Sequence, residues 1–79
     1  MPQEKIDQLR LQKPVRDEMS DLLRALNAAS TREGLEAERA VQIEVIQGLE
    51  STRKLRAADA EALYIIFDDA VEERLANLP

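Results

Sequence analysis

Residues 58–78, ADAEALYIIFDDAVEERLANL, decide the fold class of this 79-residue chain. At about 100° per residue, the apolar side chains of this segment fall on one face of a helix. That face holds six apolar residues and an aromatic edge: Leu63, Ile66, Phe67, Ala70, Val71 and Leu75, with Tyr64 at the margin. Phe67 and Tyr64 are the only aromatic residues of the chain. We therefore expect this face to lie in the core.

The opposite face of this predicted helix is acidic, with Ile65 near its middle; its acids are Glu61, Asp68, Asp69, Glu72 and Glu73. Residues 59–79 hold six acids and one Arg, a net charge of −5, whereas residues 1–58 hold ten charges of each sign. A local field of one sign attracts partners of the other sign. We predict that a protein with a basic or mixed basic and apolar surface binds at Ile65, Asp68, Asp69, Glu72 and Glu73. The alternatives are an ordinary solvated face, and an Ile65 buried against the N-terminal segment or a second copy of the chain.

Two further helices are predicted upstream, over residues 14–29 and 31–50. Ser30 and Glu33 have the spacing of a capping box, which predicts a break between these helices and an antiparallel hairpin. The apolar stripe of the first helix consists of Leu11, Val15, Met19, Leu22, Leu26 and Ala29, widened by Leu23. The broad face of the second helix carries Leu35, Val41, Val45, Ile46 and Leu49.

The remaining segments have weaker patterns. Residues 3–12 predict a short helix that Pro14 ends, and about ten residues are marginally helical without packing. We expect a single helical domain over residues 1–79, in which residues 1–13 are a loosely ordered N-terminal segment. Residues 51–58 are either a connector with Leu55 turned inward or a continuation of the second helix. The last helix is expected over residues 59–77.

The short chain favours self-association. A domain of this size buries only about 60% of the surface of its unfolded chain, and without Cys or His it has no disulfide or usual metal clip. We expect a homodimer whose seam lies at Gln42, Val45 and Leu49. Gln42 is either a partly exposed side chain at this seam or a buried polar residue that fixes register. Gly48 costs about 1 kcal/mol relative to Ala in a helix interior, which a close helix contact or a helix end there would explain.

The residue types argue against catalysis. Without His or Cys, the usual general base and the thiol nucleophile are missing, and no Gly-rich phosphate loop is present. We expect no enzymatic activity, no cofactor and no metal site. Arg53, Lys54 and Arg56 form the one basic cluster, which we expect to pair with the acidic helix rather than bind nucleic acid directly. No apolar run approaches a transmembrane length and no signal segment opens the chain, so we expect no membrane association and a cytoplasmic location.

The last helix resembles one segment of a known family. Its spacing F-x-x-A-x-x-x-R-L-A-x-L, at Phe67, Ala70, Arg74, Leu75, Ala76 and Leu78, resembles the C-terminal helix of the small Hha and YmoA modulators, which bind nucleoid proteins. The resemblance covers about a dozen residues and does not establish membership. This chain has Asp68, Glu72 and Glu73 where that family usually has Tyr, Asp and His. What the resemblance implies is a modulator that acts by binding a protein.

These patterns together predict an all-α protein, either a small three-helix bundle or a helical hairpin plus a C-terminal helix, and dimeric. The expected function is that of a small non-enzymatic regulator or adaptor that binds protein through the acidic C-terminal helix. An inhibitor encoded by a mobile element is one form of such a regulator. The alternatives are an acidic nucleic-acid mimic that occupies a basic groove and an obligate small subunit of a larger assembly.

Overall fold

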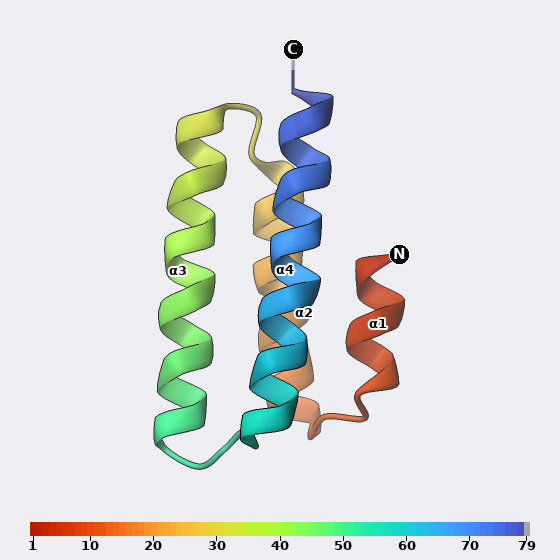
Figure 1. Ribbon diagram of the computed structural model, residues 1–79, viewed down its shortest axis with the longest axis vertical. Helices are drawn as coiled ribbons and strands as arrows, with labels where there is room; N and C mark the ends of the chain where they lie inside the picture. Colours follow the sequence, from red (N-terminus) through yellow and green to blue (C-terminus); the bar gives the residue numbers. More distant parts are fainter. Residues whose placement is uncertain (79) are drawn as a thin grey trace.

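The protein is all-helical over residues 1–78, the part of the chain that the structure, a computed structural model, describes. Its helices are α1 (Pro2–Gln8), α2 (Lys13–Ala28), α3 (Arg32–Ser51) and α4 (Ala57–Asn77). The three long helices run in alternating directions, and α1 lies beside α2 and α4 (Figure 1). The predicted all-α class and the break near residue 30 are confirmed. The expected helices over 14–29, 31–50 and 59–77 lie within two residues of the observed bounds.

The core forms around α4, as its apolar face predicts. Phe67 is completely buried, and the fully or largely buried residues of α4 are Ala60, Leu63, Ile66, Phe67, Ala70 and Val71. Tyr64 and Leu75 lie at the margin of this cluster and are partly buried. The 100° periodicity therefore assigned the inward side of α4 correctly.

The N-terminal segment is part of the core rather than loosely held. Its helix is α1, which begins at Pro2 and ends at Gln8, and Ile6 has none of its surface exposed. The segment was expected to be loosely ordered because a helix of about ten residues is only marginally stable without packing. Burial of a whole Ile side chain contributes up to about 1.5–3 kcal/mol, enough to offset part of the cost of ordering one short helix.

The helix α2 contributes four buried side chains to the core: Val15, Met19, Leu23 and Leu26.

The start of α3 differs from the predicted capping box by one residue. Thr31 is the N-cap, and its Oγ1 accepts a hydrogen bond from the Gly34 N–H at 3.0 Å. Ser30 lies outside the helix and is exposed, so the expected Ser30–Glu33 pair is wrong. Ser and Thr are both good N-caps, so the sequence alone could not distinguish adjacent candidates.

The connector between α3 and α4 follows the first of the two alternatives for residues 51–58. The Arg53 N–H donates to the Glu50 carbonyl at 3.1 Å and the Lys54 N–H donates to the Leu49 carbonyl at 2.9 Å, the pattern of a Schellman motif. Arg53 has a φ of 62°, in the left-handed region that this motif requires. Leu55 then turns inward with 6% of its surface exposed. The chain therefore reverses sharply and brings α4 antiparallel to α3.

Candidate functional site

The acidic face of α4 points away from the bundle. Ile65 is 58% exposed, whereas Leu63 and Ile66, close to it in the sequence, are buried in the core. Asp69 and Glu72 follow at helical spacing and are exposed as well. The alternative that Ile65 is buried against the N-terminal segment is wrong, because Ile65 stays 58% exposed in the presence of that segment.

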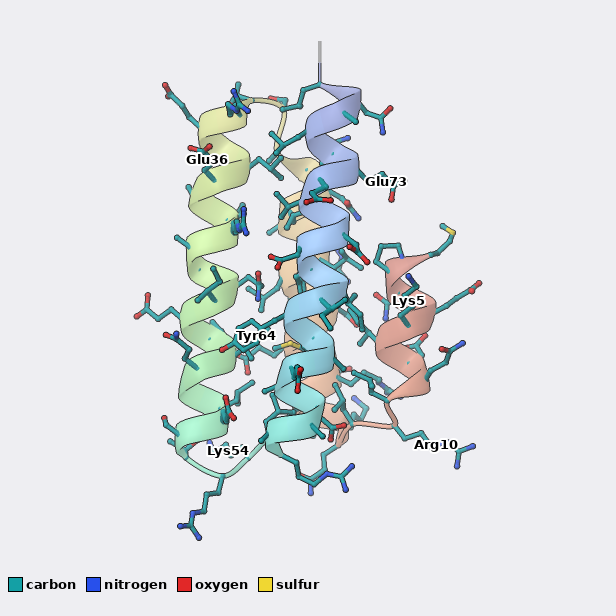
Figure 2. All side chains as sticks on the ribbon, viewed as in Figure 1. Lys5, Arg10, Glu36, Lys54, Tyr64 and Glu73 are labelled. Carbon is teal, nitrogen blue, oxygen red and sulfur yellow. The ribbon has the colours of Figure 1, made fainter. Side chains whose placement is uncertain are left out.

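The five predicted binding residues do not all lie on the same part of this face. Asp68 faces α3, where its Oδ1 lies 3.2 Å from Nη2 of Arg39. Glu73 lies on the side of α1 and lines a hollow with Met1 and Pro2 (Figure 2). Ile65, Asp69 and Glu72 lie between these two margins. We call these three residues the central stripe of α4.

The Arg39–Asp68 pair joins α3 to α4 at the surface. Both side chains are about half exposed, at 45% for Arg39 and 52% for Asp68. Exposed ion pairs contribute roughly 0–1 kcal/mol because solvent screens them. Asp68 is therefore already paired within the chain, and a basic partner has to compete for it. Among residues 1–78, no group of three or more potential ligands could hold a metal ion.

The predicted dimer seam divides into two different environments. Val45 and Leu49 are partly buried and, with Val41 and Gly48, line the α3 side of a shallow hollow that Glu18 of α2 also lines. Val41 belongs to the broad apolar face expected for this helix, and 47% of its surface is exposed. The apolar face of α3 is wider than its neighbours can cover. The part left over forms an apolar surface on the bundle, consisting of Val41, Val45 and Leu49.

Gln42 points the other way, into the bundle. Only 1% of its surface is exposed, so the interpretation as a partly exposed side chain is wrong. Neither its Oε1 nor its Nε2 has a hydrogen-bond partner in the part of the chain that is described. A buried amide without partners costs roughly 1–3 kcal/mol. The chain therefore carries a destabilising residue in the middle of α3.

Arg74 ties the end of α4 to the first hairpin. Its Nη2 donates a hydrogen bond to the carbonyl of Ala29, the C-cap of α2. A cation at this place also complements the partial negative charge at the end of α2. Arg74 was noted in the sequence only for its spacing, and this contact explains why it is partly buried.

Tyr64 lies at the edge of α4 next to α3 (Figure 2). Burial, and to a lesser degree the nearby Glu50 carboxylate, raise the pKa of its phenol above the usual 10.0. The folded state therefore holds this proton more tightly than the unfolded state. Its contribution to stability is present below the usual tyrosine pKa and is lost as the pH rises through the raised value.

The basic cluster pairs with the acidic helix at only one of its three residues. Arg56 donates through Nε and Nη2 to Oδ2 of Asp59, both at 3.2 Å. Arg53 and Lys54 form no ion pair with any residue from 1 to 78. The expected pairing therefore holds for Arg56 alone.

No protein-family model, curated protein or solved structure matches this chain. The resemblance to the Hha and YmoA helix therefore receives no support beyond its own few residues. None of the helices over residues 1–78 has the length and apolar character needed to cross a membrane.

Proposed function

We propose that this chain is a small, non-enzymatic cytoplasmic regulator or adaptor that binds another protein through the central stripe of α4. The observation that carries the proposal is the position of Ile65, an apolar side chain 58% exposed on the helix that otherwise forms the core. Acidic side chains surround it. An apolar centre with a polar rim is the usual arrangement of a protein interface.

The negative charge of the central stripe indicates what kind of protein surface binds it. Asp69 and Glu72 form no ion pair with residues 1–78, and α4 holds most of the excess negative charge of the chain. Such a surface speeds association with basic partners and disfavours acidic ones. The partner is therefore a protein whose surface offers Lys or Arg around an apolar pocket.

The test compares matched variants in a capture experiment from lysate of the native host. Ile65→Ala and the double variant Asp69→Asn, Glu72→Gln each alter the central stripe. Gln47→Ala and Glu36→Gln are the controls, since both residues are exposed on α3 and lie outside the central stripe and the apolar surface of α3. We expect a partner that both stripe variants lose and both controls keep. Capture that is equal for all four variants contradicts the proposal.

Salt separates this function from an acidic nucleic-acid mimic. Exposed charges are screened beyond about 8 Å at physiological ionic strength. A mimic that relies on charge alone loses its target steeply as salt rises, whereas an interface centred on Ile65 keeps much of its affinity. Ile65→Ala should mainly accelerate dissociation, and the double acid variant should mainly slow association.

We also propose that the protein forms a homodimer through the apolar surface of α3. Val41, Val45 and Leu49 offer a second copy an apolar contact, and Gln42 is not part of it because its side chain lies inside the bundle. Light scattering at micromolar to millimolar concentration should give the mass of a dimer. Val41→Asp should yield a folded monomer, while the control Ile65→Asp stays dimeric. A monomeric wild-type protein over this range contradicts the dimer.

A further inference from the structure

One end of the bundle gathers cations that the rest of the molecule does not neutralise. The connector before α2 and the connector before α4 meet at this end, around an open hollow of about 300 Å³. Four of the nine residues that line it are basic: Arg10, Arg53, Lys54 and Arg56. Arg10 lies on the α1 side of this end and Lys54 on the α3 side (Figure 2). The hollow is distinct from the central stripe of α4.

Three of these four cations are available to a ligand. Arg56 is occupied by Asp59, the one acid that lines the hollow. Arg10, Arg53 and Lys54 form no ion pair with residues 1–78. The protein has an excess of five negative charges, so acids to pair with these cations are present in the chain but are placed elsewhere.

The backbone makes two of these residues unusual. Arg10 has a φ of 54° and Arg53 a φ of 62°. Each follows the end of a helix, α1 or α3, at the place where Gly is the usual residue because it has no Cβ to strain. These two Arg are the only residues with a positive φ within residues 1–78, and both line the same hollow. Helix termination alone explains the left-handed conformation but not the guanidinium.

Backbone donors at this end support the same chemistry. Gln12 and Arg56 are the N-caps of α2 and α4, both line the hollow, and neither helix has a side-chain cap. By contrast, Thr31 fills this role for α3 at the opposite end. Free amide N–H groups at a helix start attract anions, and they add to the field of the nearby cations.

We propose that this hollow binds an oligophosphate group, with Arg10, Arg53 and Lys54 as its charged contacts. Arg is suited to phosphate because its planar guanidinium donates two parallel hydrogen bonds, and Lys supplies a mobile point charge. Because the cations lie on both sides of this end of the bundle, they suit a chain of phosphates better than a single one. The phosphates belong either to a free inorganic chain or to a nucleotide.

The probe is inorganic tripolyphosphate, titrated into the full-length protein at low salt and followed by the amide signals in NMR spectra. We expect saturable shifts confined to residues 10–13, Val15 and residues 53–59. Arg53→Gly and Arg10→Gly should each weaken binding about tenfold, the effect of losing one charge-assisted contact. Neither variant should lower the melting temperature, because Gly relieves the left-handed backbone. Arg24→Ala, in which an exposed Arg of α2 is removed, is the control and should bind as the wild type does.

A parallel titration with adenosine triphosphate identifies the source of the phosphates. Equal affinity for tripolyphosphate and adenosine triphosphate indicates that the phosphate chain alone is recognised, and tighter binding of the nucleotide indicates a nucleotide. The proposal is overturned if millimolar tripolyphosphate gives no saturable shift, or if both Gly variants bind like the wild type. It is also overturned if the same signals shift with protein concentration alone and the Asp69→Asn, Glu72→Gln variant abolishes this. That result would assign the cations to the acidic face of a second copy.

Discussion

α3 and α4 have almost the same length and lie side by side, yet they contribute very differently to the core. The 21 residues of α4 bury six apolar side chains, whereas the 20 residues of α3 bury three side chains, of which one is Gln42. Val41 of α3 is 47% exposed, and a Cβ placed on Gly48 would meet nothing within 4 Å. The comparison teaches that α4 is specified for the core of its own chain, and that α3 is not optimised for the stability of a monomer.

The largest effect is expected on the α4 side of this comparison. Phe67→Ala removes the largest completely buried side chain, and such a truncation typically costs about 3–5 kcal/mol. The whole stability of a small domain is of similar order, about 5 kcal/mol at the low end. The variant should be largely unfolded by circular dichroism at room temperature. A cooperative melt near the wild-type midpoint would show that α4 does not organise the core.

The next effect has the opposite sign and lies on α3. Gln42→Leu removes a buried amide without hydrogen-bond partners and should stabilise the fold by about 1–3 kcal/mol, measured by urea unfolding. Gln47→Leu, at an exposed position of the same helix, is the matched control and should change stability by less than about 0.5 kcal/mol. If Gln42→Leu is destabilising instead, the amide has a partner that a single chain does not supply.

Gly48 offers a smaller gain on the same helix. Its position is helical and open to solvent, so neither a close helix contact within the chain nor a helix end explains it. Gly48→Ala should raise the free energy of unfolding by about 0.5–1 kcal/mol. Gly34→Ala is the matched control and should gain less, because the new Cβ would lie 3.1 Å from Oγ1 of the capping Thr31. No gain at Gly48 would contradict its open environment, and equal gains at the two sites would contradict the crowding at Gly34.

The smallest effect on stability returns to α4. Ile65→Ala changes the exposed side of the helix. The free energy of unfolding, obtained from the thermal midpoint, should therefore change by less than about 0.5 kcal/mol. This result would sharpen the contrast between the two faces of α4. A fall of many degrees, or a new oligomeric state, would make Ile65 structural and remove the basis of the proposed binding surface.

The sequence predicted most where a single periodicity decided the answer. In α4 the spacing of large apolar residues separated Phe67 from Ile65 correctly. In α3 the same reasoning failed, because periodicity shows which residues share a face but not how much of that face the neighbouring helices cover. Val41 and Ile46 were therefore assigned to one broad face, although Val41 is exposed and Ile46 is buried, and Gln42 was expected at a seam. Their positions depend on how α2 and α4 pack against α3.

Contacts between distant parts of the chain were also beyond sequence reasoning. Ile6 belongs to a helix too short to be stable alone, and its burial depends on residues far along the chain. The hollow between Arg10 and Arg53 was missed for a related reason. Gly usually signals a left-handed helix end, and neither of these positions has one. The basic residues were visible in the sequence, but their convergence at one end required the fold.

The packing of α1 against α4 has a consequence for how the chain folds while it is being synthesised. α1 is synthesised before α4, and it packs against both α2 and α4, so its burial is complete only once α4 exists. At about 5–20 residues per second, Ile6 waits on the order of seconds before the residues that complete its burial exist. During that interval the faces of α2 and α3 that α4 covers are also exposed, so chaperones and proteases can reach them until α4 is made.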